Sequence, residues 1–332
     1  VFRYLKEWNT LTERIAFWVD LEHPYVTMDN NFIESGWWTI KQLWDKGLVY
    51  QGYKVTPHCP RCGTSLSSHE VALGYKDDVP DPSVFVKFKV DLSREGVGGL
   101  REYFPEGIPT YLVAWTTTPW TLPGNTALAV SAKDAYAVIE VAGRDGPERL
   151  VLAEARLPHV VRDEYKMIST GIPGGNMAGM RYEPLFQPAD YGIAVKSFQR
   201  VGQGTPILRD TEAPKTYPVI ITDFVSMEDG TGIVHIAPAY GEADYQAGQD
   251  NCLHFVHTVD LQGKVIGSYP FAGKFVKTAD PLVLDDLKSR NHILRSETIN
   301  HTYPFCWRCG TPLLYYAKQS WYIRTTEVKE RL

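Results

Sequence analysis

The sequence predicts a mixed α+β protein in which a β-rich, barrel-like domain is inserted into a smaller module of helices and cysteine knuckles. Three observations predict this class: apolar residues at helical spacing near the start, many short β-patterned segments in the middle, and two matching Cys-x-x-Cys pairs far apart. We expect residues 1–79 and 301–332 to form the base module, and residues 80–300 to form the inserted domain.

The composition sets broad limits on the protein. A chain of 332 residues has room for two or three domains, and 44% hydrophobic with 22% charged residues is typical of globular proteins. The net charge of −5 argues against a surface coated with basic residues for nonspecific nucleic-acid binding. No apolar run approaches the roughly 18 residues of a membrane helix. We expect a cytoplasmic monomer with no membrane partner, and a fragment of a longer chain, because the sequence starts in mid-pattern without Met.

The first elements are expected to be helices. A 3–4 residue spacing of apolar side chains predicts a first helix, with the residues Leu5, Trp8, Leu11, Ile15 and Trp18. Asp29 and Asn30 are candidate N-caps for a second helix over residues 32–46, which Gly47 would end. Residues 48–74 are β-patterned. The run Asp77–Pro82 predicts a turn-rich hinge and a domain boundary.

The middle of the chain is expected to be a sheet of short strands. Residues 84–90 alternate, so that Val84, Val86, Phe88 and Val90 share one face while Phe85, Lys87 and Lys89 take the other. Proline and glycine between the β-patterned segments favour a barrel-like or mixed sheet. The further strand candidates are 111–118, 126–130, 136–141, 150–153, 216–224 and 232–236. Residues 280–290 predict a short helix, and residues 313–325 follow the second cysteine pair.

The two cysteine pairs are near copies that read C-x-R-C-G-T. Cys59 with Cys62, and Cys306 with Cys309, each place two thiolates on a short turn, and the following glycine lets the backbone fold around sulfur. Four thiolates would complete a closed, structural Zn²⁺ site joining the chain that enters and leaves the insertion. The alternatives are two half-sites completed by ligands such as His58 or His69, or free thiols. The fifth cysteine, Cys252, is expected to be a buried apolar residue.

A threonine triplet predicts a polar ligand site at a strand end. Thr116, Thr117 and Thr118 follow the apolar run Tyr111–Ala114, and Pro119 stops the strand because it has no N–H. Three hydroxyls and freed backbone groups at one strand end suit binding of a polar ligand and a water molecule. β-propensity alone explains one or two threonines, but not the whole block from Trp115 to Trp120.

Two segments resemble the signatures of a known family. The block from Trp115 to Asn125 resembles the threonine-rich peptide of the editing domain in class I isoleucyl-tRNA synthetases. The segment from Gly230 to Tyr245, GTGIVHIAPAYGEADY, resembles the second signature of that domain. The resemblance covers essentially the whole chain, including Arg3–Trp8 and Ser320–Tyr322. It identifies the insertion as an editing domain on a zinc-knuckle base.

The resemblance implies an enzyme that hydrolyses an ester. Its substrate would be the 3′ end of tRNA(Ile) carrying valine, a product that a synthetic pocket built for isoleucine cannot reject well. Asp244 matches the aspartate that anchors the α-ammonium group, and His235 matches the histidine thought to reject the larger cognate side chain. Thr116, Thr117 and Thr118 match hydroxyls expected to bind the terminal adenosine and the water. Trp115, Asn125 and Ala237 complete the expected substrate-binding set, with Asn125 either contacting the adenosine or supporting the site from behind.

Other interpretations of these residues remain open. Asp244 could be a helix cap, His235 a core histidine bonded to backbone, and the tryptophans ordinary core residues. Valyl and leucyl editing domains typically carry Thr-Thr-Arg-Pro where this chain has Thr118, which favours the isoleucyl type. A noncatalytic, zinc-dependent tRNA-binding module is an alternative of another class. The His-x-Gly-His and Lys-Met-Ser-Lys-Ser signatures are absent, so ATP binding and amino-acid activation are expected only of a full-length synthetase.

Overall fold

The computed structural model describes residues 2–93, 98–105, 107–200 and 206–331. The chain divides into two compact units. One comprises residues 1–52 with 319–332, and the other comprises residues 53–318. Both helices predicted near the start lie in the first unit, and the threonine triplet, the second signature and all five cysteines lie in the second.

The first unit contains the two predicted helices. Helix α1 spans Phe2–Arg14 and α2 spans Asn30–Asp45. Helix α1 ends earlier than the apolar spacing indicated, since Ala16 has a left-handed backbone with φ 56°. Gly47 ends α2 as expected: its φ is +70° and its N–H binds the Trp44 carbonyl at 2.8 Å. Two short 3₁₀ helices, η6 (Thr325–Glu327) and η7 (Lys329–Arg331), lie at the other end of the sequence.

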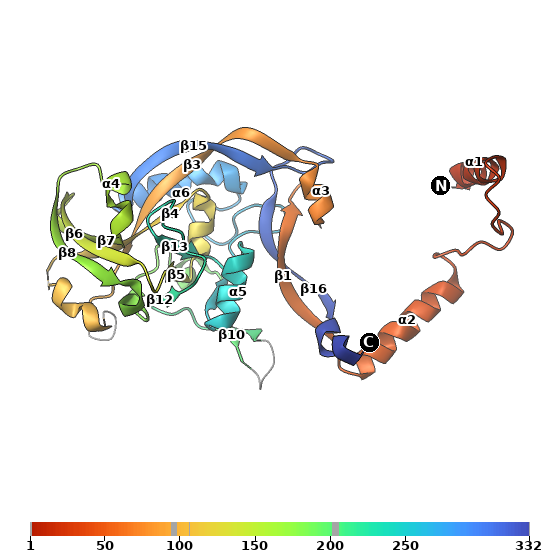
Figure 1. Ribbon diagram of the computed structural model, residues 1–332, viewed down its shortest axis with the longest axis horizontal. Coiled ribbons are helices and arrows are strands. Elements are labelled where there is room, and N and C mark those ends of the chain that lie inside the picture. The colour runs from red at the N-terminus through yellow and green to blue at the C-terminus, as the bar shows by residue number, and fades with distance from the viewer. Residues whose placement is uncertain (1, 94–97, 106, 201–205, 332) are drawn as a thin grey trace. The chain divides into compact units, whose positions relative to one another are not determined.

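The second unit is built on a ten-stranded sheet, visible at the left of Figure 1. Its strands are β3 (Tyr75–Lys89), β4 (Thr110–Thr116), β5 (Ala127–Val130), β6 (Ala135–Gly143), β7 (Gly146–Ala153), β8 (Tyr165–Pro173), β9 (Arg181–Tyr182), β12 (Tyr217–Ile221), β13 (Ile233–Ile236) and β15 (Ile293–Pro304). Strand β4 pairs antiparallel with β3 on one side and parallel with β7 and β13 on the other.

Part of this sheet closes into a ring. The path β3–β4–β13–β5–β12–β9 returns to β3, because Val90 bridges Tyr182 just beyond the end of β3. Two backbone hydrogen bonds seal the seam, from Asp91 N–H to the Arg181 carbonyl at 2.9 Å and from Glu183 N–H to the Lys89 carbonyl at 2.8 Å. Closure removes the exposed edges that an open sheet would leave. The predicted α+β class with a barrel-like sheet is confirmed.

Smaller elements complete the two units. A second sheet has the order β11 (Ile207–Thr211), β10 (Val195–Gln199), β14 (His254–Val256), and a third has the order β16 (Leu314–Ile323), β1 (Val49–Cys59), β2 (Thr64–Ser65). The remaining α-helices of the second unit are α3 (Ser68–Ala72), α4 (Leu157–Val160), α5 (Glu242–Asp250) and α6 (Val276–Ser289). Strands β8, β9, β10, β11, β14 and β15 were not predicted. No helix in the described ranges is long and apolar enough to cross a membrane.

The core lies on both faces of β3. Val84, Val86, Phe88 and Val90 pack inside the main apolar cluster, as their alternation predicted. Phe85 faces a second cluster, with Tyr111 and Val113 of β4. Even Lys87 is buried on that side, where its ammonium group lies 2.6 Å from a Glu148 carboxylate oxygen. The polar positions of the alternating pattern therefore did not mark a solvent-exposed face.

The turn-rich hinge predicted at Asp77–Pro82 is wrong. This segment is part of β3, which pairs with β15 as the long bent ribbon of Figure 1. Here β3 has β15 on one side only, so Pro80 and Pro82 can occupy alternate positions without removing a ladder bond. The domain boundaries expected at 79/80 and 300/301 lie within β3 and β15, and the compact units divide near residues 52 and 318. The expected division into an inserted domain and a base stays a prediction.

Three smaller expectations also differ. The threonine strand ends at Thr116 and not at Thr118, and the helix expected from residue 280 begins at Val276. Cys252 is exposed, not buried: it follows the C-cap of α5 with a left-handed φ of 53°, which turns the chain away at the surface.

Candidate functional site

The threonine triplet forms the junction between a strand and a 3₁₀ helix. Strand β4 ends at Thr116, and Thr118 precedes helix η2 (Pro119–Gly124). Proline suits this first helical position because its N–H would have no partner there. The Thr116 hydroxyl accepts the Thr118 backbone N–H at 3.1 Å and lies 3.3 Å from the Thr118 hydroxyl. These local bonds fix the directions of the Thr116 and Thr118 hydroxyls.

The sheet topology brings the two signature segments together. Strands β4 and β13 are parallel neighbours, with Trp115 opposite Val234, so both strands end at the same edge. Thr116 and His235 directly follow that pair. A pocket of about 400 Å³ opens at this edge. Its lining includes most of the residues predicted for the site, namely Trp115, Thr116, Thr117, Thr118, His235, Ala237 and Asp244.

His235 is held by hydrogen bonds at both ring nitrogens. Its Nε2 lies 2.8 Å from the Thr121 hydroxyl, and its Nδ1 lies 3.1 Å from the side-chain nitrogen of Asn125. The Thr121 hydroxyl donates to the Thr118 carbonyl at 2.8 Å, so it can only accept from the ring. Asn125 in turn accepts from the Tyr182 hydroxyl at 2.6 Å, which leaves its amide nitrogen to donate to Nδ1. The network therefore assigns the neutral tautomer with hydrogen on Nε2.

The environment keeps His235 uncharged. Burial lowers its pKa to about 4, because the imidazolium form would lose its hydration. Protonation would also set an Nδ1–H against the Asn125 amide hydrogens. With one nitrogen carrying hydrogen and the other already accepting, the ring has no lone pair left with which to take a proton from water. Both ring nitrogens are used inside the protein, so the edge of the ring at the pocket can act only through its shape.

Asp244 is one of two aspartates that line the pocket, together with Asp229. It lies in the first turn of α5, and one carboxylate oxygen accepts the Ala237 backbone N–H at 2.9 Å. Burial raises the pKa of this carboxyl to about 6, an effect that the Ala237 N–H partly offsets. Gly241 makes this placement possible, since a Cβ there would lie 2.7 Å from the Asp244 carboxyl carbon. The second carboxylate oxygen remains available for a cationic ligand.

Asn125 and Tyr182 stand behind the pocket. Asn125 does not line the pocket; it is buried behind His235, where its amide nitrogen also binds the Ala127 carbonyl at 2.9 Å. This position fits the supporting role that was one of the two alternatives for Asn125, while the contact with adenosine stays a prediction. Tyr182 and Thr121 were missed from sequence. Thr121 could have been found from the sequence. It follows Thr118 by three residues, and side chains three apart lie above one another in a 3₁₀ turn.

The two tryptophans of the first signature have different surroundings. Trp115 forms a wall of the pocket, and its indole N–H donates to the Ser83 hydroxyl at 2.8 Å. Trp120 is buried and packs edge-on against Tyr240, with ring centroids 4.9 Å apart. Tyr240 lines the pocket, so Trp120 supports a wall without reaching the ligand space.

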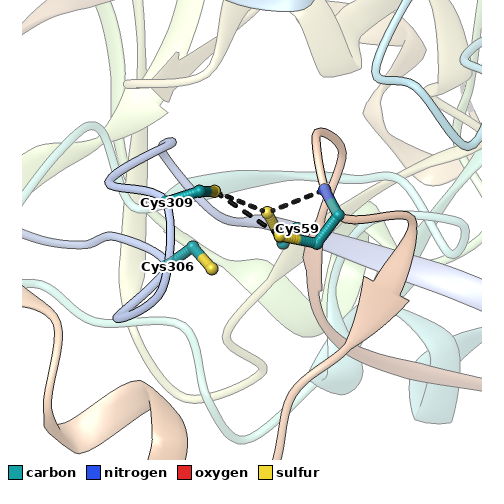
Figure 2. Close-up of side chains that lie close together, drawn as sticks. Cys59, Cys306 and Cys309 are labelled. Atoms are coloured by element: carbon teal, nitrogen blue, oxygen red, sulfur yellow. Dashed lines mark hydrogen bonds between the residues drawn. The ribbon is translucent and has the colours of Figure 1, made fainter.

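The four cysteines predicted to share a metal lie together. The sulfur atoms of Cys59, Cys62, Cys306 and Cys309 are all within 4.8 Å of one another. Cys309 lies 3.5 Å from Cys59 and 3.6 Å from Cys62, sulfur to sulfur. Figure 2 shows Cys59, Cys306 and Cys309 converging from two opposed loops. Zinc–sulfur bonds of about 2.3 Å at tetrahedral angles place sulfurs about 3.8 Å apart, so the cluster fits such an ion.

The two knuckles have matching backbones. Gly63 and Gly310 both have φ of +67°, and each donates its N–H to the carbonyl of the first cysteine of its pair at 2.8 Å. A left-handed residue is needed at this point of the turn, which explains the glycine in both copies. The alternative of two half-sites is not supported, since all four sulfurs share one cluster and His58 uses Nε2 on the Leu261 carbonyl at 2.9 Å.

Comparisons with known proteins show the family of this chain. The family model described as tRNA synthetases class I (I, L, M and V) matches residues 1–332. Isoleucine–tRNA ligase of Dehalococcoides mccartyi (strain CBDB1) is 57% identical over 334 residues, which cover 100% of this chain and 32% of that protein. Isoleucine–tRNA ligase of Thermus thermophilus is 42% identical over 332 residues, with coverage of 100% and 28%. The chain thus spans about a third of the length of its curated relatives.

Solved structures of editing domains are among the matches. The crystal structure of GlLeuRS-CP1 has a TM-score of 0.44 at 16% identity, covering 65% of this chain and 98% of that one. The Plasmodium knowlesi cytosolic leucyl-tRNA synthetase editing domain has a TM-score of 0.45 at 12% identity, covering 69% and 99%. On the sequence match along its full length, the chain belongs to the class I tRNA synthetase family, and its curated relatives there are isoleucine–tRNA ligases.

Proposed function

We propose that this chain carries out editing by hydrolysing the ester bond between valine and the 3′ end of tRNA(Ile). The observation that carries this proposal is the single pocket in which Thr116–Thr118, His235 and Asp244 meet from three separate elements. The names of the relatives point to isoleucine as the cognate amino acid. A misactivated valyl adenylate carries the same aminoacyl group and is a second possible substrate of the pocket.

In this proposal, some residues of the pocket bind the substrate and others position the attacking water or limit the side chain that fits. The free oxygen of Asp244 would take the α-ammonium group in a charge-assisted hydrogen bond. The threonine hydroxyls at the end of β4 would bind the terminal adenosine and hold the attacking water near the carbonyl. Hydroxyl and backbone donors there would stabilise the charge that develops on oxygen. The neutral His235 edge would limit the length of the side chain that fits.

A covalent mechanism is not part of this proposal. A nucleophilic threonine needs an adjacent base, and the one imidazole beside the triplet already uses both nitrogens on Thr121 and Asn125. Water attack on a positioned ester requires only orientation and charge stabilisation, which together account for large rate gains in enzymes.

Two alternatives are weighed against this function. A valyl- or leucyl-type editing specificity is disfavoured by Thr118 in place of the arginine of those peptides and by the isoleucine–tRNA ligase relatives. A noncatalytic tRNA-binding module would not need a carboxylate with a pKa of about 6 beside a pocket of hydroxyls.

The test is release of valine from valyl-tRNA(Ile) by the purified chain, with isoleucyl-tRNA(Ile) as the matched substrate. Valine release above the rate of spontaneous hydrolysis, with isoleucine spared, is the expected result. Tight tRNA binding without any release would support the binding module. Release of leucyl esters in preference to valyl esters would support the leucyl type.

We further propose that the four-cysteine cluster holds one structural Zn²⁺. Two buried and two more accessible sulfurs at tetrahedral spacing form a complete ligand set with no position left for substrate. The bound ion would tie the loop after β1 to the loop between β15 and β16. The rest of a longer synthetase and tRNA are the partners proposed for this chain, while monomeric state and cytoplasmic location stay predictions.

His235→Ala is expected to remove the size limit of the pocket. Without the ring, the longer cognate side chain gains room, so deacylation of isoleucyl-tRNA should rise about 10-fold or more, the order that one methylene controls in an apolar pocket. The measurement is the ratio of isoleucyl to valyl deacylation rates. His159→Ala, at an exposed histidine of α4, is the control. An unchanged ratio in His235→Ala would refute the size-limiting role.

The deacylation rate is expected to depend on the ionisation of Asp244. The ammonium group binds the carboxylate form, so activity should fall by about tenfold per pH unit as the pH drops below about 6, the pKa of this carboxyl. On the alkaline side the α-amino group itself loses its charge near its usual pKa of about 8. The check is the background-corrected valyl-tRNA deacylation rate from pH 5 to 9. A flat acid limb would contradict the anchor.

A further inference from the structure

The side chain of Asp280 is buried in α6 and has no part in the proposed chemistry. It is 3% exposed, and one carboxylate oxygen accepts the backbone N–H of Trp120 at 2.8 Å. The other oxygen is buried without a hydrogen-bond partner among the described residues. Burying a carboxyl group with a single hydrogen-bond partner is unfavourable. The one bond that Asp280 makes, to the backbone N–H of Trp120, is therefore the contact to explain.

The N–H of Trp120 is the donor that helix η2 cannot satisfy by itself. Pro119 has no N–H, and the N–H of Thr121 binds the Thr118 carbonyl at 3.0 Å. The Thr118 side chain makes no capping bond to the helix backbone. Asp280 therefore caps η2 from 160 positions away in the sequence.

Helix η2 connects the contact with Asp280 to the pocket through two of its residues, Thr121 and Trp120. The next residue, Thr121, lies 2.8 Å from Nε2 of His235 and 3.3 Å from the Thr118 hydroxyl. The ring of Trp120 packs against Tyr240, which lines the pocket. A shift of the first turn of η2 would move Thr118, Thr121 and the Tyr240 wall together.

We propose that Asp280 is a positioning residue of the editing site, acting as a remote cap that holds η2 so that Thr118, Thr121 and His235 keep their arrangement. This inference rests on the proposed function for its kinetic consequence. The capping of η2 by Asp280 does not depend on that function, because it rests only on the contact between α6 and η2.

The charges around Asp280 set how its capping strength varies. Burial is the largest cause that raises the pKa of Asp280 to about 7. Lys277 of the same helix lowers this pKa, and Asp81 of β3 raises it. Asp81 is itself paired with Lys277 at 2.6 Å and with His301 of β15 at 2.9 Å. Tyr303 and Glu297 of β15 line the cavity beside Asp280, and η2 carries no charged side chain. Asp280 thus changes charge near neutral pH, and the carboxylate is the stronger acceptor.

The kinetic test compares Asp280→Ala, Asp280→Asn and the wild-type chain. Asp280→Ala leaves the Trp120 N–H without an acceptor, so kcat for valyl-tRNA deacylation should fall on the order of 10-fold while KM stays within about twofold. Asp280→Asn keeps a carbonyl acceptor and should restore most of kcat. Asp285→Ala, at an exposed position of the same helix, is the matched control.

The pH profile separates positioning from a general loss of stability. Asparagine imitates the uncharged acid at every pH, whereas wild-type Asp280 gains its charge through about pH 7. The ratio of wild-type to Asp280→Asn rates should therefore rise between pH 6 and 8. Asp244 titrates equally in both proteins and cancels from the ratio. A ratio that stays constant over this range would overturn the proposal.

A measurement without substrate separates this inference from the proposed function. Hydrogen exchange of the Trp120 amide, followed by NMR, should be protected in the wild-type chain and in Asp280→Asn, and accelerate about 10-fold in Asp280→Ala. The ¹⁵N shifts of His235 should report the Nε2–H tautomer in the first two proteins. If the wild type shows these signals but no deacylation, the function fails and the cap stands. Unchanged Trp120 exchange in Asp280→Ala, or loss of protection in Asp280→Asn, would overturn the cap.

Discussion

Replacing Asp244 with alanine is expected to abolish measurable deacylation of valyl-tRNA(Ile). The substitution leaves the α-ammonium group of the substrate without its anchor inside a largely desolvated pocket, and removing one partner of such a pair costs about 3 kcal/mol or more, roughly 100-fold in rate. Alanine also frees the Ala237 N–H, which Asp244 accepts at 2.9 Å. The measurement is kcat/KM for valine release at pH 7.5.

Asp244→Asn distinguishes the two roles of this side chain. The amide retains an oxygen for the Ala237 N–H but carries no charge, so structure is kept while the ammonium anchor is lost. We expect Asp244→Asn to be nearly as inactive as Asp244→Ala, with an unchanged melting temperature. Glu242→Gln, at an exposed acidic residue two positions earlier in α5, should keep full activity. Full activity of Asp244→Asn would show that the charge is unnecessary.

Loss of the metal site is expected to have the largest effect on stability. Cys59→Ser, or removal of the ion with a strong chelator, breaks the link between two loops that are separated by 243 positions in the sequence (306 − 62 − 1). Structural zinc contributes directly to folding free energy, so we expect a loss of at least about 3 kcal/mol and a fall in melting temperature of roughly 5–10 °C. Metal content per chain and thermal unfolding measure both parts of this prediction.

Cys252→Ser is the matched control for the metal site. Cys252 is exposed and lies outside the four-sulfur cluster, so this variant should retain one zinc per chain and the wild-type melting temperature. A Cys59→Ser protein that binds zinc in full and melts at the wild-type temperature would exclude the proposed site. Zinc loss without a change in stability would show that the ion does not pin the two loops.

The fold class could be predicted because its signals are local. Period-2 alternation over residues 84–90 and the glycine of each cysteine knuckle specify backbone conformation from neighbouring residues alone. The prediction of a hinge at Asp77–Pro82 was wrong because it, too, relied on local signals. Pro80 and Pro82 look like turn residues locally, yet β15 pairs with their strand from more than 200 positions away. A proline is compatible with a strand wherever one side of that strand lacks a partner, and the sequence does not reveal which side that is.

The site was predictable in its pocket-lining residues and not in what holds them. Thr116–Thr118, His235 and Asp244 belong to contiguous motifs, so the chain itself displays them. Tyr182, Thr121 and Asp280 act through side-chain hydrogen bonds across 57 to 160 positions, and each alone is an ordinary residue. Asn125 shows the limit most clearly: the motif marked the residue, but only its bonds to Tyr182 and His235 show that it lies behind the imidazole and not in the lining of the pocket.

The seam of the barrel couples folding to function. Tyr182 bridges Val90 where the ring closes, and the hydroxyl of the same tyrosine orients the amide that fixes His235. The imidazole thus receives its orientation only after β9 has met the end of β3, 92 positions earlier in the sequence (182 − 90). If His235 sets the size limit of the pocket as proposed, a chain in which this ring of strands is still open would lack that limit, so the barrel has to close before the site can discriminate between side chains.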